Sequence, residues 1–333
     1  MRAFTRLRKN LSCGRVSRRS PPNIMGDEGG CFGARCRLTI LLFPALLQAM
    51  ERLLGAHVST AGGVSQSFLI ADTLQLRAMQ IFAKNNNQWM SKPLAVKEID
   101  TFHARRAASG LQSIFSHAGY LINLASPDEE ISSKSFASML QELTRAEELQ
   151  LAFVVLHPGA HMGKGEAQGL KVVSEMANRL FDHTRDSSVK IAFEITAGQG
   201  TCLGYRFEHL AEILHGVENK ERAVVCFDTA HAFAAGYDFR TISGYEQMWK
   251  HFNETIGLSK LCAIHLNDSK KDVGTRVDRH DHIGKGFIGL EGFRHLMNDG
   301  RFLALPMVLE TPKEGDPEKY DAENLAKLRE LIR

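Results

Sequence analysis

The chain of 333 residues has no uncharged apolar stretch long enough to cross a membrane. Leu38–Met50, the longest, has 13 residues, whereas a membrane-spanning helix needs about 20. The six cysteines form no C-x-x-C motif and no disulfide-rich spacing, which favours a reducing, cytosol-like compartment. With 44% apolar and 24% charged residues, the composition is typical of a globular protein and excludes a disordered chain or a collagen.

Acidic residues are absent from the first 20 residues, which are rich in Arg and Ser. Residues 1–49 hold nine Lys or Arg and only two acids, Asp27 and Glu28. Residues 1–49 therefore have a net charge of +7. Because the whole chain has a net charge of +3, residues 50–333 have a net charge of −4. The basic balance therefore belongs to the first segment and does not by itself indicate that the body binds nucleic acid.

Three interpretations of residues 1–49 stay open: an upstream translation of a protein that starts at Met50, a mitochondrial-type targeting peptide, or a functional basic arm. We favour the first, because an organised pattern begins abruptly at Glu51. We expect this extension to be disordered, and a chain that starts at Met50 to fold and keep full activity.

Eight short apolar runs follow residue 51, each with the length of a strand that is buried on both faces. They are RLLGAHV (52–58), AMQIFAK (78–84), LQSIFSH (111–117), LAFVVLH (151–157), VKIAFEI (189–195), AVVCFD (223–228), LCAIHL (261–266) and LPMVLE (305–310). The stretches between them have helical spacing, as in Phe136, Met139, Leu140 and Leu143. Eight strand–helix units predict an α/β fold, a single-domain (β/α)8 TIM barrel over residues 50–333. A doubly wound open sheet is the alternative, but Gly62-Gly63 lacks its G-x-G-x-x-G spacing.

Six consecutive runs have a histidine or a carboxylate as their last or last but one residue. These residues are His117, His157, Glu194, Asp228, His265 and Glu310. In a parallel barrel the strand ends open onto one face, so we expect these side chains to converge. Burying them together without partners would be costly, and bound cations would remove that cost.

Loop residues add further candidate ligands. His231 follows Asp228 by three residues, and Asp278 and His280 lie in the long charged loop 267–286. His57 and His161 also fall near the barrel mouth, where we expect them to support the ligands or the substrate.

Five imidazoles and four carboxylates without cysteine suit Zn²⁺, Mn²⁺ or Fe²⁺ better than Ca²⁺ or Mg²⁺. Nine donors exceed the need of one ion and, with a shared carboxylate, suit three. Three divalent ions would change the charge of residues 50–333 from −4 to about +2. Most of that positive field would lie at the barrel mouth, where a phosphate could bind.

Eight segments resemble the endonuclease IV family, the apurinic/apyrimidinic (AP) endonucleases of DNA base-excision repair. The segments are HVSTAGG (57–63), HAGYLINL (117–124), HPGAH (157–161), EITAGQG (194–200), DTAHAFAAGYD (228–238), HLND (265–268), VDRHDHIGKGFIG (277–289) and LET (309–311). The resemblance covers residues 52 to 311, and it implies a TIM barrel with a usual start close to Met50.

The resemblance also implies three zinc ions, which Mn²⁺ or Fe²⁺ could replace. His117 and His157 would bind the first ion and share Glu194 with the second. Asp228, His265 and Glu310 would complete the second site. The third ion would be held by His231, Asp278 and His280.

The implied reaction is hydrolysis of the phosphodiester on the 5′ side of an abasic site, giving a 3′-hydroxyl and a 5′-deoxyribose phosphate. Glu194 would be the catalytic residue, because it fixes the spacing of two ions. The implied partner is double-stranded DNA that contains abasic sites, and 3′-phosphodiesterase activity is a further expectation. We expect a monomer that acts in the cytoplasm at the nucleoid, or in mitochondria or the nucleus if residues 1–49 are a targeting peptide.

Two loops are candidates for contact with DNA. The family usually has Arg before Gln-Trp after its second strand, whereas Asn87 precedes Gln88-Trp89 in this chain. In the next loop, Tyr120 and Leu121 form a candidate wedge between base steps. Simple packing is the alternative role for Trp89 and Tyr120.

Two other functions stay open. A sugar isomerase or epimerase with the same barrel would need only one ion, bound by Glu194, Asp228, His265 and Glu310. It would have no use for the five other predicted ligands. A DNA-binding module without catalysis is the other possibility, and the full set of nine donors argues against it.

Overall fold

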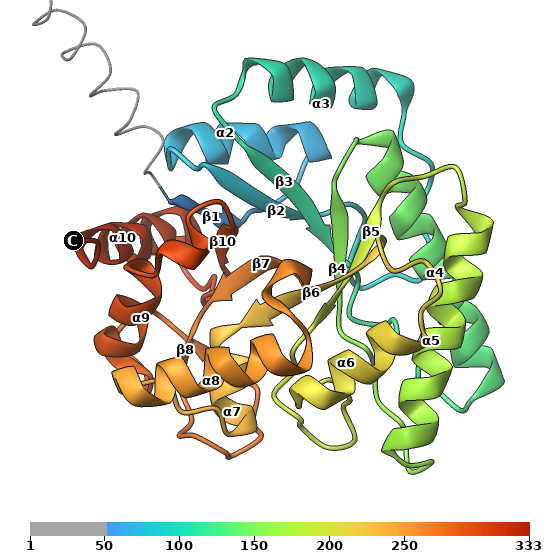
Figure 1. Ribbon diagram of the computed structural model, residues 1–333. Coiled ribbons are helices and arrows are strands. Elements are labelled where there is room, and N and C mark those ends of the chain that lie inside the picture. Colours follow the sequence, from blue (N-terminus) through green and yellow to red (C-terminus); the bar gives the residue numbers. More distant parts are fainter. Residues whose placement is uncertain (1–51) are drawn as a thin grey trace, which may run out of the picture. The chain divides into compact units, whose positions relative to one another are not determined.

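The computed structural model describes residues 52–333. The predicted disordered extension, residues 1–49, lies outside that range. The described chain forms a closed barrel of eight parallel strands surrounded by helices (Figure 1). The order around the barrel is β1-β10-β7-β6-β5-β4-β3-β2. The predicted single-domain TIM barrel is therefore confirmed, and the open-sheet alternative is wrong.

Each of the eight predicted apolar runs contains one barrel strand. The strands are β1 (Leu53–His57), β2 (Ala78–Phe82), β3 (Ser113–His117), β4 (Phe153–Leu156), β5 (Lys190–Glu194), β6 (Ala223–Asp228), β7 (Leu261–Leu266) and β10 (Pro306–Leu309). Gly55 allows β1 to approach β2 closely, because a Cβ atom at this position would lie 1.8 Å from the carbonyl oxygen of Ala78.

Helices occupy the connections between the strands. They are α2 (Ser67–Thr73), α3 (Val96–Ala108), α4 (Glu129–Glu148), α5 (Glu166–His183), α6 (Phe207–Gly216), α7 (Thr229–Ala235), α8 (Ile242–Thr255), α9 (Gly289–Met297) and α10 (Pro317–Glu330), with 3-10 turns at η1 (Val64–Gln66), η2 (Leu258–Lys260) and η3 (Gly300–Phe302). The helical spacing that begins at Phe136 lies in α4, where Met139 and Leu143 are fully buried against the barrel. None of the helices in residues 52–333 is both long and apolar enough to cross a membrane.

Side chains alternate along each strand between two cores, because successive residues of a strand point to opposite faces. The outer core packs against the helices. The inner core fills the barrel with Ala78, Phe115, Phe153, Val155, Ala192, Val224, Cys226, Ala263 and Val308. The residue two positions beyond an inner-core residue also points inward, at the carboxyl end of the barrel. This alternation directs the predicted ligands towards one site.

A short antiparallel hairpin, which the apolar runs did not predict, lies beyond β7. It consists of β8 (Asp268–Ser269) and β9 (His280–Asp281). The hairpin gives the long charged loop a fixed base, and its second strand contains His280.

Candidate metal centre

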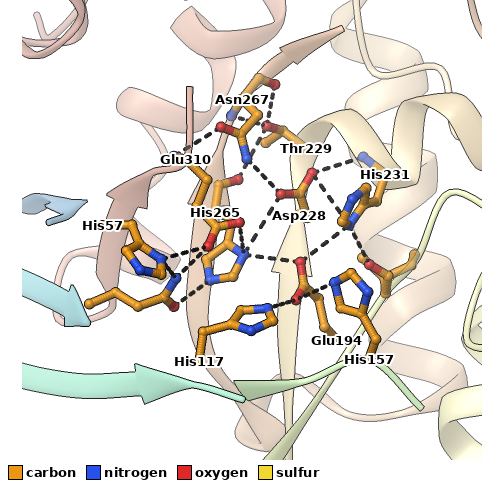
Figure 2. A network of polar contacts seen from close by, with 12 residues as sticks. His57, His117, His157, Glu194, Asp228, Thr229, His231, His265, Asn267 and Glu310 are labelled. Atoms are coloured by element: carbon orange, nitrogen blue, oxygen red, sulfur yellow. Dashed lines mark hydrogen bonds and ion pairs between the residues drawn. The ribbon is translucent and has the colours of Figure 1, made fainter. Parts of the chain in front are cut away.

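The carboxyl ends of six strands carry donor side chains, as predicted. His117, Glu194 and Asp228 are the last residues of β3, β5 and β6, and His265 is the last but one residue of β7. His157 and Glu310 directly follow β4 and β10. Figure 2 shows these side chains pointing towards one another.

His231 reaches the same site because a helix begins immediately after β6. The Asp228 side chain caps α7 by accepting a hydrogen bond from the backbone N–H of His231 at 2.8 Å. This helix start brings both side chains to the centre, as their spacing predicted.

The hairpin of β8 and β9 contributes Asp278, from its loop, and His280, from β9. The Asp278 carboxylate lies 3.2 Å from Nε2 of His231 and 3.4 Å from Nε2 of His280. All nine predicted ligands therefore meet in one cluster, and Glu194, Asp228 and His265 have no exposed surface.

The donors form three groups, and within each group the ligand atoms all lie within 4.8 Å of one another. The groups are His117, His157 and Glu194; Glu194, Asp228, His265 and Glu310; and Asp228, His231 and His280. The first two agree with the ligand sets that the resemblance implies. In the third, Asp228 stands where Asp278 was expected, while Asp278 contacts both histidines of that group.

The spacing of these atoms fits divalent ions. Two ligands of one tetrahedral zinc ion, each bonded at about 2.1 Å, lie about 3.4 Å apart. Nε2 of His117 and Nε2 of His157 each lie 3.2 Å from Oε2 of Glu194. In the four-donor group, Nδ1 of His265 lies 3.1 Å from Oε2 of Glu310 and 3.7 Å from Oδ2 of Asp228. The nitrogen and oxygen donors and their distances thus suit ions of the zinc type.

Glu194 joins two of the groups through different oxygen atoms. Its Oε2 faces His117 and His157, whereas its Oε1 lies 3.0 Å from Nδ1 of His265. This geometry is that of a carboxylate that can bridge two cations.

Hydrogen bonds to the backbone orient three of the histidine rings. In three cases Nδ1 of the ring bonds to a backbone carbonyl oxygen: His117 to Ala118, His231 to Ile195, and His280 to Glu310, at 2.7–3.0 Å. Such bonds orient the ring and select the tautomer whose other nitrogen is free to bind a cation.

Opposite charges keep the cluster ionised. Burial alone would raise the pKa of Glu194, but the imidazoles of His265 and His157 outweigh burial and hold it well below its usual range. Burial would lower the pKa of His231, yet Asp228 and Asp278 raise it well above the ordinary value. The Glu194 carboxylate therefore remains charged and able to attract cations.

A pocket of about 820 Å³ opens beside the cluster, and we call it the mouth pocket. Its lining includes Glu310 and His280 from the centre and two of the predicted DNA-contacting residues, Asn87 and Tyr120. Tyr120 is 64% exposed and Leu121 39%. Trp89 is half-buried, and neither it nor Leu121 lines the pocket.

The two supporting histidines differ in position. Nδ1 of His57 lies 3.2 Å from Oε1 of Glu310, so His57 contacts a predicted ligand. His161 instead accepts a hydrogen bond from the backbone N–H of Gly165 at 3.0 Å.

Three polar residues at the site were missed from the sequence: Gln80, Asn267 and Asp268. The Asn267 amide donates to Oδ2 of Asp228 at 2.7 Å and accepts from the backbone N–H of Glu310 at 3.0 Å (Figure 2). Gln80 lies in the middle of an apolar run, and this isolated polar residue is the signal that could have revealed it.

Known proteins resemble this chain over most of its length. Residues 68–331 match the family model described as xylose isomerase-like TIM barrel. A protein named "Probable endonuclease 4" from Chloroflexus aurantiacus is 47% identical over 278 residues, which are 84% of this chain and 97% of that protein. A protein of the same name from Geobacter sulfurreducens is 46% identical over 284 residues, 85% of this chain and 96% of that protein. The crystal structure of endonuclease IV from Thermus thermophilus has a TM-score of 0.74 and 35% identity, and the match covers 84% of this chain and 98% of that chain.

The chain belongs to the endonuclease IV family. Its barrel also occurs outside the endonuclease IV family, because a D-tagatose 3-epimerase-like protein matches with a TM-score of 0.63 at 21% identity. At that identity the likeness shows the fold alone. The donor groups, rather than the barrel, must therefore carry the argument for function.

Proposed function

We propose that this protein hydrolyses the DNA phosphodiester on the 5′ side of an abasic site, at a centre of three zinc ions, and leaves a 3′-hydroxyl and a 5′-deoxyribose phosphate. Membership of the endonuclease IV family supports the class of reaction. The observation that carries the proposal is the presence of three donor groups joined by Glu194 and Asp228.

Divalent ions in such a centre activate water for attack and stabilise negative charge on the phosphoryl group and the leaving oxygen. The chain's own residues set where this chemistry occurs. Glu194 presents one oxygen to each of two groups and so fixes their separation. Asp228 belongs to both the four-donor group and the group of His231 and His280, and it fixes the second separation.

The mouth pocket supports an extruded abasic nucleotide as the substrate. It opens beside Glu310 and His280, and its volume of about 820 Å³ lies in the usual range of ligand-binding pockets. An abasic nucleotide has no base to unstack, so it leaves the duplex at low cost. We expect the exposed Tyr120 and Leu121 to fill the gap that it leaves.

The neighbouring loops are held together, which supports a common role at the duplex. A Cβ atom added to Gly119, just before Tyr120, would lie 3.2 Å from the backbone oxygen of Asn86, just before Asn87. The two loops are therefore in close contact. The buried Lys84 and Glu142 side chains approach to 3.4 Å, and Glu142 accepts from the backbone N–H of Gly119. One ion pair thus ties the Asn87 loop to the Tyr120 loop.

A sugar isomerase or epimerase is the second candidate, since the four-donor group alone could hold the single ion that such an enzyme needs. The other two groups have no role in that reaction. They favour the nuclease.

The test is incision of a duplex that contains one tetrahydrofuran residue, an abasic analogue that cannot undergo β-elimination. We expect the zinc-loaded protein to cut immediately 5′ of the analogue and to leave a 3′ end that a DNA polymerase extends. The same duplex with a normal nucleotide should stay intact. No incision, or a cut on the 3′ side, would contradict the proposal.

The expected 3′-phosphodiesterase activity needs a separate substrate. A nicked duplex with a 3′-phosphoglycolate end should be converted to a 3′-hydroxyl, and polymerase extension reports the product. An unchanged end would limit the proposed function to abasic sites.

A further inference from the structure

Gln80 lies inside the barrel at the level of the donor groups. It is fully buried and lies two residues beyond Ala78 of the inner core, so its side chain points inward like the predicted ligands. Its amide contacts three side chains: His265, Glu310 and His57. A neutral amide is a poor zinc ligand, and another role must explain its place among charged donors.

The first contact selects the tautomer of His265. Nδ1 of His265 faces Glu194 and Glu310 at 3.0 and 3.1 Å, which makes it the nitrogen that would bind an ion in this group. The opposite nitrogen, Nε2, then carries the proton and donates it to Oε1 of Gln80 at 2.8 Å. Gln80 thus supplies the acceptor that backbone carbonyls supply for His117 and His231.

The second contact orients Glu310. Nε2 of Gln80 donates to Oε1 of Glu310, which leaves Oε2 facing His265. The other N–H of the amide faces Nδ1 of His57 at 2.8 Å. A reversed amide would place its oxygen against the Glu310 carboxylate and its NH₂ against the N–H of His265, so the orientation is determined by its partners.

We propose that Gln80 is a positioning residue of the four-donor group, where one amide sets the tautomer of His265 and the direction of the Glu310 carboxylate together. The inference rests on the metal binding in the proposed function. Because two ligands of one ion are ordered before the ion arrives, the affinity of that group for zinc increases. Residues with this role typically change metal affinity by about 10–100-fold when they are replaced.

The test is a competition for zinc between the protein and a chromogenic chelator of known affinity, with the ions retained per chain counted by native mass spectrometry. Gln80→Met removes the hydrogen bonds to His265 and Glu310 and keeps a similar side-chain volume. In Gln80→Asn the amide is kept but withdrawn by one methylene. We expect each variant to bind one ion about 10–100-fold more weakly than the wild type, with the remaining ions unchanged.

Gln141→Met is the matched control, because within residues 52–333 its amide bonds only to the backbone of Ser91, at 2.8 Å, and contacts none of the predicted ligands. This variant should retain zinc like the wild type. Thermal unfolding of the metal-free proteins separates a loss of zinc affinity from a loss of fold, and Gln80→Asn carries the test if Gln80→Met does not fold.

Three outcomes decide the inference. The inference would be overturned if both Gln80 variants bound every ion with an affinity within about twofold of the wild type. It would also be overturned if the affinity for every ion fell by the same factor. If the wild type retains only one ion, the three-ion proposal fails instead. The role of Gln80 is then still decided by whether the Gln80 variants bind that single ion more weakly, because the isomerase alternative uses the same four-donor group.

Discussion

At the scale of single residues, Glu194 has the most connected position in the candidate centre. It is fully buried, and His117, His157, His231 and His265 all lie within 3.2 Å of its two oxygens. A neutral side chain of the same shape would keep the packing but lose the charge that holds two cations at a fixed separation.

Glu194→Gln should therefore abolish incision while abasic DNA still binds. We expect the single-turnover rate to fall by at least about 10³-fold, which corresponds to about 4 kcal/mol of transition-state stabilisation. Glu175→Gln, at an exposed carboxylate on α5, is the control and should cut normally. Turnover near the wild-type rate in Glu194→Gln would remove the basis for the three-ion assignment.

Asn87 is the residue at which this chain departs from the family pattern. It is exposed on the loop after β2 and lines the mouth pocket. Asn is shorter than Arg and uncharged, so it cannot make the phosphate contact that an arginine could make.

Asn87→Arg should bind abasic DNA more tightly than the unchanged protein, measured in the Glu194→Gln background to block turnover. One added phosphate contact should steepen the plot of log affinity against log salt by about 0.9. Cleavage at saturating substrate should hardly change, since position 87 lies outside the donor groups. Equal affinity and equal slope would show that this loop does not face DNA.

At the scale of elements, the hairpin of β8 and β9 is a part of the centre that the ends of the barrel strands do not position. Asp268, at the base of the loop, is fully buried and accepts from the backbone N–H groups of Ser269, Gly284 and Ile288 at 2.8–2.9 Å. Burial outweighs these bonds and raises the pKa of Asp268. The segment from Ser269 to Ile288, which includes Asp278 and His280, is thus hydrogen-bonded at both ends to a single carboxylate.

Asp268→Asn should loosen this loop and leave the barrel intact. An Asn keeps one acceptor oxygen, but its NH₂ group must face backbone N–H groups, which costs about 1–3 kcal/mol. We expect thermal unfolding at lower temperature and the weakest retention for the ion of the His231 and His280 group. The matched control is Asp272→Asn, an exposed carboxylate of the same loop. Equal zinc retention by both variants would show that Asp268 does not hold the loop in place.

At the scale of the whole molecule, the barrel and six of the nine donors could be predicted from sequence for one physical reason. Strands that are buried on both faces form short apolar runs, and the side chain at the end of each run emerges at the same face of the barrel. Val155 and His157, or Ala192 and Glu194, show this alternation directly.

The supporting residues could not be found in the same way. Gln80 lies within its run, and only the closure of the barrel brings it to His265 and Glu310, far along the chain. Asp268 acts on the backbone of residues 16 and 20 positions later, which no local pattern shows. Their roles depend on tertiary structure, whereas six of the ligands can be recognised by their residue type and their position at a strand end.

The number of ions per chain tests the central claim most directly, because the nuclease and the isomerase share the four-donor group and differ in the rest. Metal analysis of the purified protein, after gel filtration in zinc-free buffer, should give close to three equivalents of divalent metal per chain. Replacing Asp278 and His280 by Ala should lower this number by one. A value close to one equivalent in the unchanged protein would contradict the three-ion centre and favour the sugar isomerase.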